Sequence, residues 1–273
     1  MFEARRQRST WGLMFGLAEV TFFAAARKVR QSHRNALVAI GMNILQSIMF
    51  IAAFYLMFNL LGTRTVAIRG NFMLYLMTGI FLYLVHIKSL TAVVGSEGPA
   101  SPMMMHARMN TIVAIVSSAL SILYQQTISL FVLLFIIHVA IAPVEIQDWN
   151  MAFFMFLLAW FTGCVAGVIL LALKPWFPDL VTIVQLVYVR ANMIASGKMF
   201  VANMLPSAMV ALFDWNPLFH VIDQMRGFVF INYNPHYTNW QYPIYFALIL
   251  LLLGLMGEFY SRKNVSSSWN AGR

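Results

Sequence analysis

Two basic residues lie inside an otherwise apolar stretch and are the residues of this sequence best placed for chemistry. The stretch begins near Leu180 and contains Arg190 and Lys198 before Pro206. In a helix, Arg190 lies about 15 Å along the axis from Leu180. An arginine at that depth in an apolar segment needs a partner, so it either attracts an anionic ligand, contacts a backbone carbonyl or extends toward water. Lys198 lies two turns further along and only roughly on the same face.

Other patterns that carry chemistry are not present in the sequence. The run 196–199, Ser-Gly-Lys-Met, is similar to the end of a phosphate-binding loop, but Asn192 stands where that motif needs glycine, and Met199 replaces its Ser/Thr. The six histidines are scattered without metal-ligand spacing, and the nine carboxylates form no paired acid and base. The single cysteine, Cys164, lies in an apolar run. The sequence therefore predicts no catalytic residue, no metal site and no bound cofactor in this chain.

The composition indicates a membrane protein. Of 273 residues, 61% are hydrophobic and 10% are charged, whereas a soluble domain carries about 25% charge. This excludes a conventional soluble enzyme and a disordered chain. The net charge of +9 comes from residues too scattered for a nucleic-acid surface, so no nucleic-acid partner is predicted.

The apolar runs predict an all-α integral membrane fold with six transmembrane helices. The spans are 36–61, 71–94, 109–144, 150–173, 180–206 and 243–260. Before them, 11–26 is predicted to be an amphipathic helix on the membrane surface, the alternative being a signal peptide. The mixed stretch 207–242 suits two short re-entrant or surface-lying helices. The chain then divides into a cytoplasmic N-terminus with the interface helix (1–35), a transmembrane domain (36–260) and a cytoplasmic tail (261–273).

The distribution of basic residues predicts the orientation. With both termini in the cytoplasm, 13 of the 18 Lys and Arg residues fall on the cytoplasmic side, as expected when short cytoplasmic loops carry the positive charge.

The second half of the chain resembles a known family. The motifs are the turn 177–179 (Phe-Pro-Asp), the run 196–200 (Ser-Gly-Lys-Met-Phe), the pair 205–206 (Leu-Pro), and 215–227, which begins Trp-Asn-Pro-Leu and ends Arg-Gly. Over about residues 170–265 the chain resembles the membrane subunits of ABC-2 type exporters, and within them the branch that exports capsular polysaccharide, O-antigen and teichoic acid. The first half matches only in layout.

The resemblance implies a function and a set of partners. It implies a permease of the bacterial inner membrane with two re-entrant helices between spans five and six. Two copies would form the pathway as a homodimer. A separate dimer of ATP-binding cassette ATPases would bind ATP and Mg and drive the export of acidic, lipid-linked polysaccharide. Periplasmic and outer-membrane export proteins are further partners that the branch implies.

Within this scheme, six residues are candidates for the cargo pathway. Arg190 and Lys198 would attract acidic sugars or a lipid phosphate. Aromatic rings stack on the apolar faces of sugars, and Trp160 and Tyr124 lie in spans while Trp215 and Tyr237 lie near the predicted outer face. The alternatives are core packing for the first aromatic pair and an interfacial aromatic belt for the second.

A second set of residues is predicted to couple the chain to its ATPase. The turn residues and adaptable side chains of the connection 95–108 suit a coupling helix; the residues are Gly98, Pro99, Pro102, Met104, His106 and Arg108. Arg27 and Arg30, at the end of the N-terminal helix, form a second docking surface. The alternatives are an ordinary loop near the membrane and binding to anionic lipid headgroups.

Three other functions remain open from the sequence. An ABC-2 exporter of another cargo, a drug or a lipid, shares all of these features. An ion-coupled secondary carrier would use Arg190 and His138, although no inverted repeat is visible. A membrane enzyme acting on lipid carriers would need a convergent acidic or histidine cluster, which the sequence does not predict.

Overall fold

All regular elements of the chain are helices in the computed structural model, which describes residues 10–31, 36–60, 68, 70–96, 98 and 111–264. Five of the helices in these ranges are long and apolar enough to cross a membrane. They are α2 (Ala36–Leu60), α3 (Phe72–Val94), α5 (Thr111–Ala140), α6 (Trp149–Leu173) and α10 (Gln241–Asn264). This is the architecture of a multi-pass membrane protein, and the sequence predicted these five helices within a few residues.

The segment predicted as the fifth span differs from expectation. Helix α7 (Pro178–Ala195) begins at the predicted turn, with proline in its first positions, but ends before Lys198. The chain turns at Gly197, whose φ of 72° favours glycine because it has no Cβ. α7 is not among the five candidate spans, so a six-span fold is not confirmed, and Lys198 does not share a helix with Arg190.

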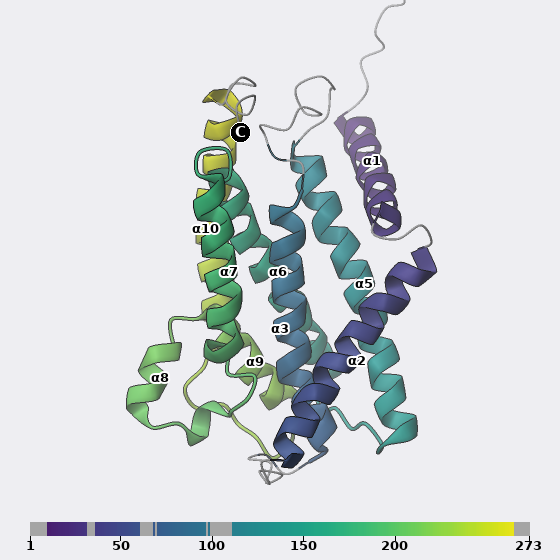
Figure 1. Ribbon diagram of the computed structural model, residues 1–273, viewed down its shortest axis with the longest axis vertical. Helices are drawn as coiled ribbons and strands as arrows, with labels where there is room; N and C mark the ends of the chain where they lie inside the picture. Colours follow the sequence, from purple (N-terminus) through teal and green to yellow (C-terminus); the bar gives the residue numbers. More distant parts are fainter. Residues whose placement is uncertain are drawn as a thin grey trace, which may run out of the picture.

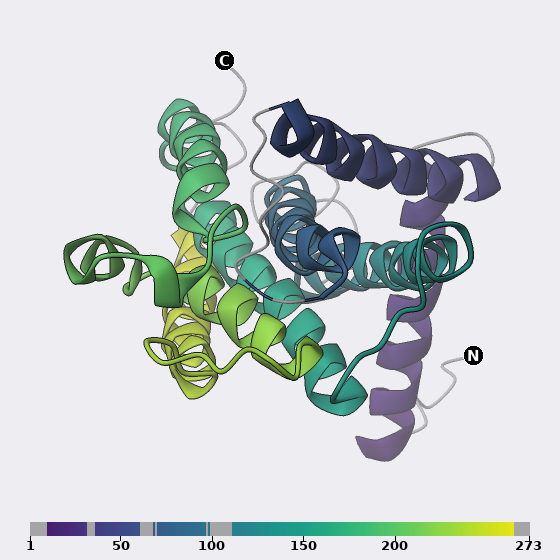
Figure 2. The ribbon, with the colours of Figure 1, turned by 90° about the horizontal axis from the view of Figure 1, so that it is seen from below.

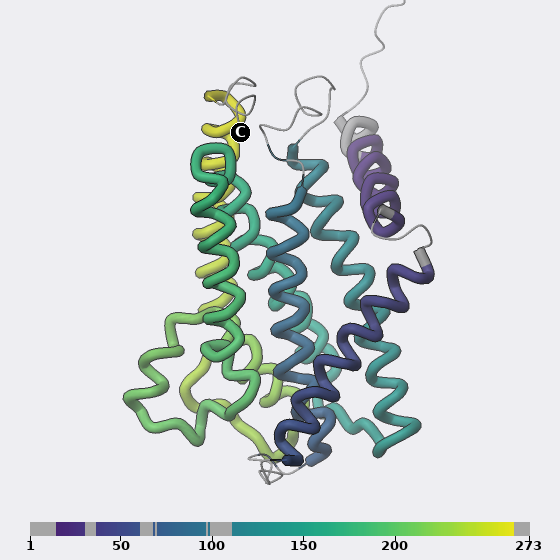
Figure 3. Tube along the Cα trace, in the orientation of Figure 1, coloured from purple at the N-terminus to yellow at the C-terminus, as the bar shows by residue number. Residues whose placement is uncertain are grey.

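The segment after α7 contains short helices, as predicted. The 3-10 turn η1 (Ala202–Met204) leads to α8 (Ser207–Phe213), and α9 (Pro217–Val229) follows before α10. Figure 3 shows the chain passing from α7 through this region at one end of the bundle before it returns along α10. Their re-entrant placement in a membrane stays a prediction.

Helix α1 (Thr10–Gln31) runs mostly across the long axis of the other helices, as the two ribbon views together show (Figures 1 and 2). It packs against α5 and exposes apolar side chains, among them Phe15, Phe22 and Phe23. The structure has a helix over the predicted residues 11–26, and it continues to Gln31. Its location at a membrane surface stays a prediction.

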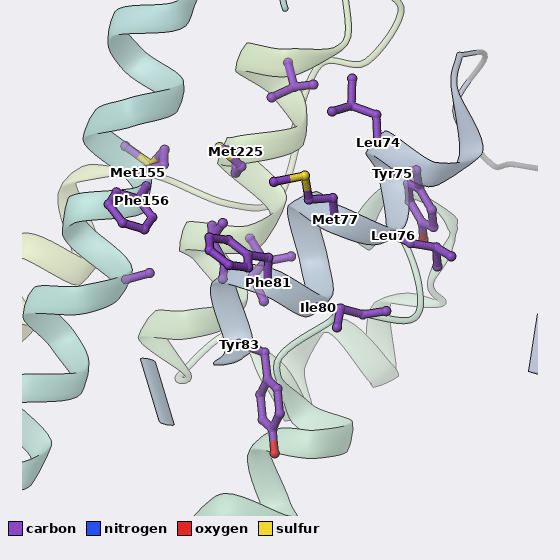
Figure 4. Packing of buried hydrophobic residues seen from close by; sticks show 14 of the residues in the cluster. Leu74, Tyr75, Leu76, Met77, Ile80, Phe81, Tyr83, Met155, Phe156 and Met225 are labelled. Atoms are coloured by element: carbon purple, nitrogen blue, oxygen red, sulfur yellow. The ribbon is translucent and has the colours of Figure 1, made fainter. Parts of the chain in front are cut away.

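Helix α3 is the centre of the molecule. It packs against α2, α5, α6 and α9, and Figure 2 shows it surrounded by the other helices. Its apolar side chains interlock with those of α6 and α9, as Figure 4 shows for Met77, Phe81, Phe156 and Met225. The tightest contact of α3 is with α6 at Gly163, where an added Cβ would lie 2.3 Å from the His86 carbonyl oxygen.

Candidate functional site

The candidate site is built around α9, whose residues from Pro217 to Arg226 are all buried. The Asn216 side chain caps the helix by accepting the Leu218 N–H at 3.1 Å, and Pro217 occupies the first turn, as an Asn-Pro pair favours at the start of a helix. The amide of Asn216 also donates to the Asn192 side chain and to the Ala195 carbonyl, each at 3.0 Å. One residue thus begins α9 and joins it to the end of α7.

The polar side chains of α9 hold the connection to α10. Asp223 accepts hydrogen bonds from the Tyr233 hydroxyl at 2.5 Å and from the Thr238 hydroxyl at 2.7 Å. His220 accepts the Asn239 N–H at 3.0 Å through Nδ1, so its Nε2 donates to the Asp214 carbonyl at 2.7 Å. These bonds explain how polar groups are buried in so apolar a chain.

Arg226 holds the turn after α7 instead of pairing with Asp223. Its guanidinium donates to the carbonyls of Gly197 at 3.0 Å, Lys198 at 2.9 Å and Phe200 at 2.5 Å. It also lies 4.4 Å from the Tyr75 ring. Asp223 and Arg226 are three residues apart on one helix, a spacing that favours an ion pair. The structure gives the two side chains separate partners because each is needed by a different connecting segment.

Lys198 extends from this turn into a box of three aromatic rings. Its ammonium lies 3.9 Å from the ring centre of Tyr83 on α3, and 4.6 and 5.0 Å from those of Phe54 and Phe50 on α2. The residue is 0% exposed and its Nζ has no hydrogen-bond partner. We call Phe50, Phe54 and Tyr83 the aromatic box. In this conformation Lys198 is closed off from any pathway.

Arg190 is exposed on α7, close to the same tyrosine. The Tyr83 hydroxyl donates to the Val189 carbonyl at 3.1 Å, and the guanidinium of Arg190 lies within electrostatic range of that hydroxyl. Figure 4 shows Tyr83 pointing away from the Met77 and Phe81 side of α3. Tyr83 therefore lies close to both cations that were predicted for the pathway: Arg190, which is exposed, and Lys198, which is buried.

The four predicted aromatic pathway residues do not share one environment. Trp160 is half-buried and its indole donates to the Ala119 carbonyl at 2.9 Å, joining α6 to α5. Tyr124 on α5 and Tyr237 before α10 are exposed. Trp215 is exposed at the rim of a cavity of about 200 Å³, whose lining includes Tyr188 and Asn192. Their contact with a cargo stays a prediction.

The predicted coupling residues are placed only in part. Gly98 lies against α6, where an added Cβ would meet the Leu171 side chain at 3.2 Å. Arg27 and Arg30 are exposed near the end of α1. The remaining coupling residues, Pro99, Pro102, Met104, His106 and Arg108, lie outside the described residues.

Two polar networks inside the bundle were not predicted. The His86 Nε2 lies 2.8 Å from the Tyr188 hydroxyl and its Nδ1 lies 3.0 Å from the Thr162 hydroxyl, so His86 joins α3 to α7 and α6. In the second network, the Lys88 ammonium donates to the side-chain oxygen of Asn43. The only sequence signal for these networks was the presence of polar residues inside apolar runs. Such residues do not indicate which other side chains they will bond to.

The second network joins α2, α3 and α5. Gln126 donates to the same oxygen of Asn43 at 3.1 Å, and the Asn43 amide donates to the Ser129 hydroxyl at 2.9 Å. Its only charge is that of Lys88, so this network is a half-buried cation held by neutral groups. His138, the second residue of the carrier hypothesis, lies elsewhere, at the end of α5, where its Nδ1 accepts the Val144 N–H at 3.1 Å.

The Tyr233–Asp223 bond predicts a response to alkaline pH. Burial, and then the carboxylate of Asp223, raise the pKa of Tyr233 above its ordinary value of 10.0. The folded chain therefore keeps this proton where the unfolded chain loses it. The contribution of Tyr233 to stability is constant below pH 10 and falls above it, by at most about 1.4 kcal/mol per pH unit. Thermal unfolding between pH 8 and pH 11 measures this decline. Tyr233→Phe should flatten it and Tyr237→Phe, at an exposed position, should not; equal curves for all three proteins would contradict the assignment.

The polar side chains of this region mainly bond to connecting segments of the chain. Among the residues that the structure describes, no three His, Cys, Asp or Glu side chains gather as metal ligands. The polar groups of α9 bond to the connecting segments before and after this helix. Around α3 lie one exposed cation, Arg190, and two buried ones, Lys198 and Arg226. No protein-family model matches this sequence, and no curated protein is significantly similar to it.

Proposed function

We propose that this chain is the membrane-spanning subunit of an ATP-driven ABC exporter that moves lipid-linked capsular or cell-surface polysaccharide across the bacterial inner membrane. It would work as a homodimer with both termini in the cytoplasm, and an ATPase dimer would supply the energy. The helical architecture with five apolar spans is compatible with this role. The motifs in residues 177–227 add the family resemblance.

The observation that carries the proposal is the convergence of those motifs. The runs 196–200 and 215–227 are separated in sequence, yet Arg226 of the second holds three carbonyls of the first. Asn216, at the start of the second run, also joins α9 to α7. Residues that resemble one family's motif thus form one connected and mostly buried unit, which supports the resemblance.

The test of the proposal is a physical and functional complex. The chain is co-expressed with a candidate ATP-binding cassette ATPase from the same genome, purified in detergent and reconstituted. We expect the two proteins to co-purify and ATP hydrolysis to change when the chain is present. Arg27→Glu with Arg30→Glu should weaken the complex, and Lys263→Glu, exposed on α10, serves as the control. Absence of a complex with unaltered hydrolysis would contradict the proposal.

Arg190 provides a test of the cargo. A lone exposed guanidinium on an apolar helix attracts an anionic group, so Arg190→Glu should lower the amount of polysaccharide at the cell surface by about tenfold, equivalent to about 1.4 kcal/mol. Polysaccharide should accumulate inside the cells. Arg262→Glu, on the exposed end of α10, is the matched charge reversal and should export normally. Normal export by Arg190→Glu at equal protein levels would remove Arg190 from the pathway.

A further inference from the structure

The buried ammonium of Lys198 is not explained by stability. The residue is fully buried, its Nζ makes no hydrogen bond, and it has no carboxylate partner within the described residues. Burying such a cation is costly, and the three rings of the aromatic box offset only part of that cost. A methionine has nearly the same length, carries no charge and packs well against aromatic rings. The folded chain with lysine at position 198 is therefore expected to be less stable than the same chain with methionine there.

Lys198 and two of the three rings around it come from elements that are held in the molecule to different degrees. The turn that carries Lys198 is fixed, because Arg226 binds three of its carbonyls, and Gly79 of α3 leaves room for that approach. Phe50 and Phe54 come from α2, which packs mainly against α3 and α5 and exposes many apolar side chains. Figure 2 shows α2 on the outside of the bundle, with α3 behind it. If the box opens, α2 is the element that moves.

We propose that Lys198 is a releasable latch that holds α2 against α3. When α2 moves away, the ammonium leaves the aromatic box and becomes exposed on the Tyr83 side of α3, where Arg190 already lies. The consequence for cargo rests on the proposed function: an anionic cargo would meet one cation in the closed state and two in the open state. Lys198 would thus be a positioning residue at rest and a cargo contact only after opening.

The first experiment separates a latch from a structural contact. Lys198→Met should leave the thermal unfolding temperature of the purified chain unchanged or higher, while Phe54→Ala, which leaves a gap in the aromatic box, should lower it. In cells, Lys198→Met should nevertheless reduce export about tenfold. If Lys198→Met lowers the unfolding temperature as much as Phe54→Ala does, the ammonium is structural and the latch is wrong.

The second experiment observes the opening itself and needs no ATPase. The full chain in phosphatidylcholine nanodiscs is treated with N-hydroxysuccinimidyl acetate, and acylation of each lysine is followed by mass spectrometry. Lys198 should react slowly compared with the exposed Lys263. Phe54→Ala should accelerate the acylation of Lys198, and Phe58→Ala should not, because Phe58 lies on the same helix but packs on Phe72. Equal rates for Lys198 and Lys263 in the wild type, or no effect of Phe54→Ala, would overturn the latch.

A third measurement keeps the two proposals distinguishable. In the complex with the ATPase, adding ATP should accelerate acylation of Lys198 but not of Lys263. If the complex forms and hydrolyses ATP while Lys198 stays protected, the latch is wrong and the proposed function stands. If no complex forms, the proposed function fails, and the latch is still decided by the isolated chain in nanodiscs.

Discussion

Replacing Arg226 with methionine is expected to unfold much of the α9 region. The side chain is 1% exposed and donates to three backbone carbonyls. Methionine fills a similar volume but leaves the carbonyls of Lys198 and Phe200 without donors, at a cost of about 1–3 kcal/mol each, whereas the Gly197 carbonyl still accepts the Phe200 N–H at 3.3 Å. We expect a loss of at least about 2 kcal/mol in the free energy of unfolding. Arg226→Lys should rescue little, because an ammonium lacks the planar fork that reaches several carbonyls.

The matched control for this prediction is Arg190→Met. Arg190 is exposed on α7, so its replacement should change stability by less than about 0.5 kcal/mol. Thermal unfolding of the detergent-purified chain, followed by tryptophan fluorescence, measures both variants. An Arg226→Met protein that unfolds at the wild-type temperature would show that the turn 196–201 is held by something other than the guanidinium.

Gly163→Ala is the second substitution expected to have a large effect. The added Cβ would lie 2.3 Å from the His86 carbonyl oxygen and 3.0 Å from the His86 Cα. These are backbone atoms of α3, so α3 and α6 must separate, which weakens the contacts of His86 with Thr162 and with Tyr188. Overpacking of this kind costs about 1–3 kcal/mol, and we expect the upper part of that range.

The control for Gly163 lies on α2. Gly41 has no atom within 4 Å of an added Cβ, so Gly41→Ala should be neutral or stabilise the chain by about 0.5–1 kcal/mol, because alanine favours a helix. Both variants are compared by unfolding in mixed detergent micelles. If Gly163→Ala is as stable as Gly41→Ala, the distance between α3 and α6 at Gly163 is larger than in the structure.

The apolar spans were predictable because charges and prolines interrupt the apolar runs at their ends. The Asn216 cap was predictable for a similar reason, since asparagine followed by proline is a local signal. The end of α7 was missed, although Gly197 was an available signal: a glycine after a helical pattern often ends the helix. Continuing that helix placed Lys198 on the wrong element.

The partners of the buried polar groups could not be predicted. Lys198 meets side chains more than a hundred positions away in sequence, and Asn43 meets Lys88 and Gln126 from two other helices. Periodicity indicates which face of one helix is apolar, but it does not indicate which helix lies opposite. The convergence of the 196–200 and 215–227 runs was likewise invisible, because the sequence contains the motifs without their relative position.

The network of Lys88, Asn43 and Gln126 has a consequence for biogenesis. A ribosome synthesises α3, with its lysine, before α5, which supplies Gln126 and Ser129. A lysine at the centre of a membrane helix costs about 2.5–3.5 kcal/mol to insert, and Lys88, which lies nearer the end of α3 than its centre, costs less than that. Its partner Asn43 comes from α2, and Gln126 and Ser129 of α5 complete the hydrogen bonds of Asn43. We therefore expect α2 and α3 to stay beside the translocon until α5 has emerged. The three helices would then enter the lipid together, as one insertion unit.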